Sequence, residues 1–155
     1  MKKTVTILLA VLTAFLFCSC GVNQPKDIDI IALGGYVKNN VAFSEEIEEV
    51  DPSVALTNFG LDETEFEAVE YATSSAVAEV FAAFKGNSAE DTAVITEAVQ
   101  NRIDYLRESY SSYGPQEVPK IESAVVITQG NCVIFCISAD NSQAKTLIEN
   151  YISQQ

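Results

Sequence analysis

The amino-acid sequence predicts an α+β domain in which a four-stranded antiparallel sheet has helices packed on one face. The predicted order is ββαββα after short N-terminal helices. Gly130-Asn131 separates two apolar runs, as in a β-hairpin with a two-residue turn. Apolar residues recur every three or four positions from Ile95 to Tyr113, as on one side of a helix. A chain of 155 residues has room for a single such domain.

The N-terminal segment is expected to be a signal and not a part of this fold. Two lysines precede an apolar run over residues 5–17, which is shorter than the roughly 20 residues that cross a membrane. Small residues then lead to Cys20, as in a lipobox, where the cysteine sulfur receives diacylglycerol before cleavage. The sequence therefore predicts a lipoprotein signal peptide over residues 1–19, cut between Ser19 and Cys20. A secretory signal cleaved without lipid and an uncleaved anchor are the alternatives.

Lipid on Cys20 is expected to hold the protein on the extracytoplasmic face of the cell membrane, since each buried CH₂ of an acyl chain contributes roughly 0.8 kcal/mol. Residues 20–26 then form the lipidated cysteine and a short tether, and residues 27–155 form the domain. The chain has 9 Lys and Arg against 22 Asp and Glu, a formal charge of -13. This balance repels phosphate backbones and excludes nucleic acid as a partner.

Two short helices are expected at the start of the domain. Residues 27–38 carry apolar positions at helical spacing, although Gly34-Gly35 interrupts them. Asp51-Pro52 is typical of an N-cap followed by the first helical position, and Gly60 is well placed to end that helix.

The first pair of strands follows. Residues 65–73 are expected to be a strand, because their apolar and aromatic positions suit a half-buried sheet. Residues 76–85 fit a second strand, but their many alanines also suit a helix, so both alternatives stay open.

The second half of the chain has clearer signals. Ser88, with a carboxylate three residues later, predicts a capping box at the start of the long helix, and Gly114 with the next proline predicts its end. A hairpin of residues 123–129 and 132–138 places Val126 opposite Phe135. Asp140 is expected to cap the last helix.

Cys132 and Cys136 are expected to be small apolar core residues. If they share a strand, their separation is about 13 Å, which is too far for a disulfide. The chain has no histidine to complete a metal site with them. We therefore expect no metal and no cofactor.

Several short motifs occur in an order that resembles the domain of unknown function 4358 family, over most of residues 27–152. A lipobox and an aromatic, acidic stretch precede them. The motifs are Phe84-Lys85, Arg102, Tyr113-Gly114-Pro115-Gln116-Glu117 and Gly130-Asn131. The resemblance implies a small bacterial lipoprotein, mostly of Gram-positive bacteria, without an assigned activity.

Three features are candidate functional sites. Eleven of the 22 acidic residues lie between Lys38 and Lys85, which predicts a solvated face or a site for Ca²⁺ or a basic partner, although no calcium-loop motif is present. Arg102 borders the apolar stripe of the long helix, and Glu79 is its candidate partner in a structural ion pair. A snorkelling arginine and a clamp for a ligand carboxylate are the alternatives. Tyr110 and Tyr113 are candidates for a groove or for core packing.

The sequence predicts a protein that is not an enzyme. Without histidine it lacks the Ser-His-Asp and Cys-His arrangements, and no GxSxG, P-loop or GxGxxG motif is present. We expect a binding domain of the cell envelope whose partner is an envelope protein or a wall component. One alternative is a carrier or sensor of a small ligand, with a pocket between sheet and helices lined by tyrosines and Arg102. A more remote one is a hydrolase that uses Asp or Glu.

Overall fold

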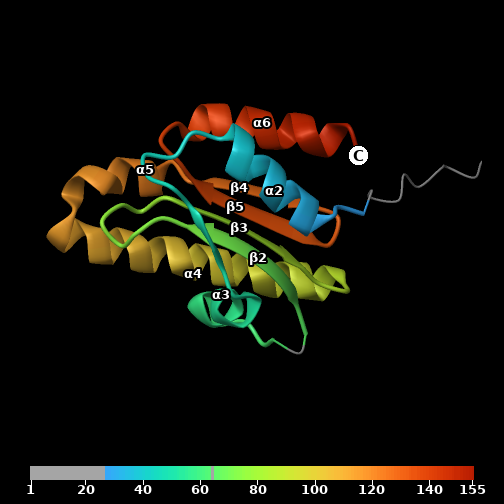
Figure 1. Ribbon diagram of the computed structural model, residues 1–155. Coiled ribbons are helices and arrows are strands. Elements are labelled where there is room, and N and C mark those ends of the chain that lie inside the picture. Colours follow the sequence, from blue (N-terminus) through green and yellow to red (C-terminus); the bar gives the residue numbers. More distant parts are fainter. Residues whose placement is uncertain (1–26, 64) are drawn as a thin grey trace, which may run out of the picture.

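The computed structural model describes residues 27–63 and 65–155, so the predicted signal peptide, with Ser19 and Cys20, lies outside the described residues. Figure 1 shows an antiparallel sheet between two layers of helices. The elements are α2 (Ile30–Asn40), β1 (Glu48–Val50), α3 (Pro52–Phe59), β2 (Glu67–Ala72), β3 (Val80–Lys85), α4 (Ala89–Tyr113), the 3-10 helix η2 (Pro115–Glu117), α5 (Val118–Glu122), β4 (Val125–Gln129), β5 (Cys132–Ile137) and α6 (Asn141–Ser153).

The α+β class is confirmed, but the predicted number of strands is wrong. Within the described residues the sheet has five strands in the order β1-β2-β3-β5-β4, and all neighbours are antiparallel. The strand that the sequence did not reveal is β1, in which Val50 is the one apolar residue and pairs with Glu70 of β2. Three residues are too few to show the alternation that marks a strand, so β1 depends on its pairing with β2.

The prediction that helices cover one face of the sheet is also wrong, because both faces are covered. α2 and α6 lie on one face, and α3 and α4 lie on the other (Figure 1). Successive residues of β3 enter the two cores in turn: Phe81 joins the core under α2 and α6, and Phe84 joins the core under α4. Strands buried on both faces are unbroken apolar runs, as β3 and β5 are.

The ambiguous residues 76–85 form a strand from Val80 onward. The hairpin is confirmed, with Val126 opposite Phe135 as predicted. Cys132 and Cys136 are buried free thiols, as expected of core residues.

α4 carries one wall of the site described below. Its capping box is confirmed, since Asp91 N–H donates to Ser88 Oγ and the Asp91 carboxylate accepts from Ser88 N–H. Its buried stripe includes Val99 and Leu106, and Arg102 lies between them at the border of the core. None of the helices within residues 27–63 and 65–155 combines the length and the apolar composition needed to cross a membrane.

Candidate binding groove along α4

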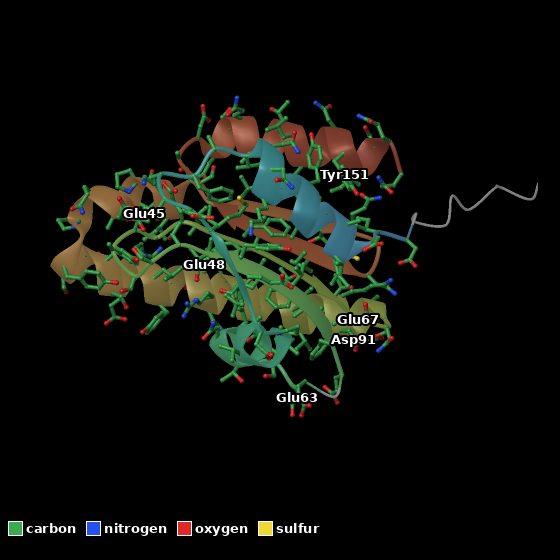
Figure 2. The ribbon with its side chains drawn as sticks, viewed as in Figure 1. Glu45, Glu48, Glu63, Glu67, Asp91 and Tyr151 are labelled. Carbon is green, nitrogen blue, oxygen red and sulfur yellow. The ribbon has the colours of Figure 1, made fainter. Side chains whose placement is uncertain are left out.

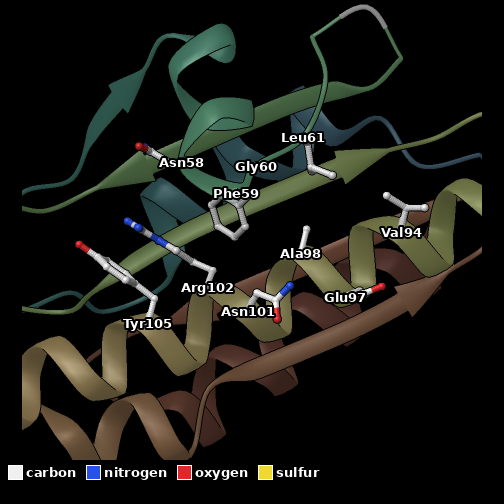
Figure 3. Close-up of a pocket in the computed structure, with 10 residues that line it drawn as sticks. All are labelled: Asn58, Phe59, Gly60, Leu61, Val94, Glu97, Ala98, Asn101, Arg102 and Tyr105. Atoms are coloured by element: carbon white, nitrogen blue, oxygen red, sulfur yellow. The ribbon is translucent and has the colours of Figure 1, made fainter.

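A surface groove runs along α4 and consists of two adjoining hollows. The first has a volume of about 620 Å³ and lies between α4 and the C-terminal end of α3 (Figure 3). The second, of about 470 Å³, lies between α4 and the connection from β2 to β3. Asn58, Arg102 and Tyr105 line both hollows, so they mark the junction. We call the two hollows together the α4 groove.

Arg102 is the cation at this junction. Its guanidinium carbon lies 5.8 Å from the ring centroid of Phe59 and 5.3 Å from that of Tyr105, so two aromatic rings hold it. Within the part of the chain that the structure describes, the guanidinium makes no hydrogen bond and no ion pair. Its N–H donors therefore remain free for a ligand.

The other basic residues show that this arrangement is particular to Arg102. Of the six lysines and arginines in the described residues, four form ion pairs with carboxylates. Lys38 is exposed, and its ammonium lies 5.4 Å from the ring centroid of Tyr71. Among the described residues, Arg102 is therefore the one partly buried cation without a carboxylate within 4 Å.

The carboxylate of Glu70 is also part of the groove. Glu70 comes from β2 and is only 2% exposed, and its Oε2 accepts a hydrogen bond of 3.3 Å from Asn58 Nδ2. Burial raises the pKa of Glu70, and the hydrogen bond from Asn58 and the charge of Arg102 offset only part of this effect. This side chain therefore holds a proton more readily than an exposed glutamate.

The predicted ion pair between Arg102 and Glu79 is wrong in its partner. Glu79 pairs with Lys120, whose Nζ lies 2.7 Å from its Oε1, and the N–H and Oγ–H of Ser44 also donate to Glu79. The physical reason is position, because Glu79 ends the connection from β2 to β3, where Ser44 and Lys120 of α5 lie within hydrogen-bond distance of its carboxylate. Arg102 contacts the rings of Phe59 and Tyr105 instead.

Lys120 links two buried carboxylates that the sequence analysis did not connect. Its Nζ lies 3.1 Å from Oε2 of Glu117, which also accepts from Ala78 N–H. Burial raises the pKa of Glu79, but the hydrogen bonds from Lys120 and Ser44 outweigh it and hold the pKa below its ordinary value. Glu117 is the last residue of the motif that begins at Tyr113. Its place in that motif is the signal in the sequence that could have pointed to it.

Tyr110 and Tyr113 do come together in the lining of the groove, with ring centroids 4.8 Å apart. Their roles differ. Tyr110 is buried, and its hydroxyl donates to the carbonyl oxygens of Val77 at 2.7 Å and Ser75 at 3.2 Å. Tyr113 is 62% exposed and Tyr105 is 59% exposed, so these two rings are accessible to a ligand.

The acidic residues between Lys38 and Lys85 do not form a cation site in the described residues. Figure 2 shows Glu45 and Glu48 apart from Glu63 and Glu67, and all four residues are exposed. Within residues 27–63 and 65–155, no group of three or more His, Cys, Asp or Glu side chains could hold a metal ion. Apart from Glu70 and Glu79, which are buried, these acidic residues are exposed and suit a solvated face.

Comparison with known families identifies the chain. A family model described as Domain of unknown function (DUF4358) matches residues 39–138. This chain belongs to that family. The predicted resemblance is thereby confirmed. No match was found among curated proteins or among solved structures.

The position of the DUF4358 match indicates which part of the fold the family model describes. The match includes all five strands, α3 and α4, and therefore every residue named above in the α4 groove. It also includes Glu79, Glu117 and Lys120. Most of α2 and all of α6 lie outside it. The face that carries the groove thus lies within the DUF4358 segment, whereas the cover of the opposite face does not.

Proposed function

We propose that this DUF4358 protein is a lipoprotein of the extracytoplasmic face of the cell membrane, anchored by lipid on Cys20, and that its domain binds a ligand without catalysing a reaction. The observation that carries the binding proposal is Arg102, a partly buried cation whose donors are free, beside the accessible ring of Tyr105. The anchor rests on the lipobox of the sequence.

The groove favours a small ligand over an envelope protein or a wall polymer. A hollow of about 620 Å³ falls within the range of small-molecule sites, roughly 300 to 1,000 Å³. A docking surface for a protein is instead marked by a contiguous apolar patch. The exposed large apolar residues of the described chain are spread over four elements: Ile31, Val54, Val94, Tyr105, Tyr113 and Val126.

The carboxylates of the groove support a role without catalysis. An Asp or Glu hydrolase needs two carboxylates that face a common substrate. Glu70 and Glu79 both line the second hollow, but Ser44 and Lys120 occupy both oxygens of Glu79. In the described lining of the second hollow, Glu70 therefore has no second free carboxylate beside it, and Glu97 lines the first hollow instead.

Thermal unfolding of the full chain in a mild detergent tests the proposal. The candidate ligands added to the protein are amino acids, peptides, sugars, organic acids and metal ions. A ligand at a hundred times its Kd adds about 2.7 kcal/mol to stability. At about 4 °C per kcal/mol, this raises Tm by about 10 °C. Tyr105→Ala should abolish the increase, whereas Val126→Ala, on the edge strand β4, should not. If no compound gives an increase that depends on Tyr105, the proposal is wrong.

A further inference from the structure

The first hollow of the α4 groove holds two opposite charges that form neither an ion pair nor a hydrogen bond within the described residues. Arg102 is the cation, and Glu97, an exposed residue of the same helix, is the anion. They are five positions apart, or about 7.5 Å along the helix axis. Figure 3 shows Arg102 toward one end of the hollow and Glu97 toward the other.

The net charge of the chain limits which ligand can use these groups. At -13, the protein repels anions at long range, and a dianion such as phosphate is repelled most. A ligand with no net charge avoids this repulsion. If it carries both charges, its carboxylate matches the planar donor fork of Arg102, and its ammonium matches the carboxylate of Glu97.

The surface between the two charges suits an amino-acid derivative. Phe59, Leu61 and Ala98 supply buried apolar atoms that an aliphatic side chain can contact. Asn101 lies between the two charged residues on α4, and its amide can both donate to and accept from a peptide group. Two extended residues span about 7 Å, which matches the axial separation of the charges.

We propose that the α4 groove binds a short zwitterionic peptide, with its carboxylate on Arg102, its ammonium on Glu97 and an apolar side chain over Phe59 and Leu61. This inference rests on the proposed function, because it names the ligand class of the same groove. It specifies two charged contacts that the general proposal does not require.

The test uses the full chain in a nonionic detergent and the dipeptide alanyl-leucine, titrated by ligand-observed NMR. The N-acetylated dipeptide and the C-terminal amide each lack one charge. A hydrogen bond to the partly buried Arg102 contributes about 1.5–3 kcal/mol, so the C-terminal amide should bind about tenfold or more weakly. Glu97 is exposed, and an exposed ion pair contributes about 0.5–1 kcal/mol, so the acetylated form should bind about two- to fivefold more weakly. Arg102→Ala and Glu97→Gln should weaken binding of the free dipeptide by the same two factors.

Matched variants separate these contacts from general effects. Arg107→Ala removes an exposed arginine of α4 that pairs with Asp104, and Glu108→Gln removes an exposed glutamate of the same helix. Both should bind alanyl-leucine as the native protein does. Arg102→Lys keeps the charge and should retain part of the affinity if Arg102→Ala unfolds the domain. Acetylation should make no difference to Glu97→Gln, because its ammonium contact is already lost.

Three results would overturn the inference. If the native protein binds the free and the acetylated dipeptide equally well, Glu97 does not bind the ammonium group of the ligand. Equal loss in Arg102→Ala and Arg107→Ala would remove the role of Arg102. Absence of dipeptide binding, while another compound shows an effect that depends on Tyr105, would overturn the ligand class and leave the proposed function standing. If no compound depends on Tyr105, both fail together.

Discussion

Lys120→Met is the substitution for which the structure predicts the largest loss of stability. The Lys120 ammonium lies 2.7 Å from Oε1 of Glu79 and 3.1 Å from Oε2 of Glu117. The side chain of Glu79 has no exposed surface, and that of Glu117 is 7% exposed. Removal of the ammonium therefore leaves two neighbouring carboxylates away from water and without a cation.

The expected magnitude follows from this burial. Removal of one partner of a buried ion pair costs about 3–5 kcal/mol. Lys120 is itself 26% exposed, so water can reach part of the site, and we expect the low end of that range, about 3 kcal/mol. In a domain of this size Tm then falls by about 12 °C. Hydrogen bonds hold the pKa of Glu79 in the folded protein below its ordinary value. The loss of stability in Lys120→Met is therefore complete above the pKa that Glu79 has in the unfolded chain, and it shrinks as the pH falls through the pKa that Glu79 has in the folded protein.

Thermal and urea unfolding of residues 27–155, followed by circular dichroism, measures the effect, since both cores lie within this range. Lys145→Met is the matched control. Its ammonium lies 3.9 Å from Glu149 on an exposed helix surface, and its loss should cost less than about 0.5 kcal/mol. Glu79→Gln in the Lys120→Met background should recover part of the loss. A decrease in Tm no larger than that of the control would refute the reasoning.

Three further predictions concern other parts of the chain. Glu70→Gln should raise Tm at pH 7, because burial raises the pKa of this carboxyl and makes its charged form costly. The gain in Tm should shrink as the pH falls toward the ordinary pKa of glutamate, and a series of unfolding curves at different pH values measures this. Gly34→Ala places a Cβ 2.9 Å from the Tyr71 ring and should cost about 1–3 kcal/mol in urea unfolding. The added Cβ of Gly35→Ala meets nothing within 4 Å, so this variant should gain up to about 1 kcal/mol in free energy of unfolding. Equal effects of Gly34→Ala and Gly35→Ala would contradict a close approach at Gly34. Cys20→Ala should abolish labelling with fatty acid and release the protein or leave it unprocessed, and a native protein that resists labelling would exclude the anchor.

Local signals in the sequence were sufficient where neighbouring residues determine the structure. The capping box at Ser88, the Gly60 cap and the register of Val126 with Phe135 each depend on residues close together in the chain, and all are confirmed. These features depend on backbone hydrogen bonds over a few positions, which the identity of a cap or turn residue largely decides.

The errors concern contacts between distant segments. Residues 80–84 are apolar at every position, which suits a strand covered on both faces, yet a run of this length does not show which helices cover it. The partner of Glu79 is 41 positions away, and only the fold brings Lys120 to it. In the sequence the Gly34-Gly35 pair interrupts a helical pattern, whereas in the structure Gly34 allows α2 to approach β2 closely.

The α4 face departs from the usual preferences of a folded protein at two adjoining positions, and this is the strongest reason to place function there. A sequence selected for stability alone would place an apolar residue at the buried position of Glu70 and give Arg102 one of the 22 available acids as a partner. Elsewhere in the described residues, the buried carboxylates of Glu79 and Glu117 pair with the ammonium of Lys120. The same chain leaves Arg102 without an ion pair in the groove, and the proposed ligand would supply the missing partner with its own carboxylate.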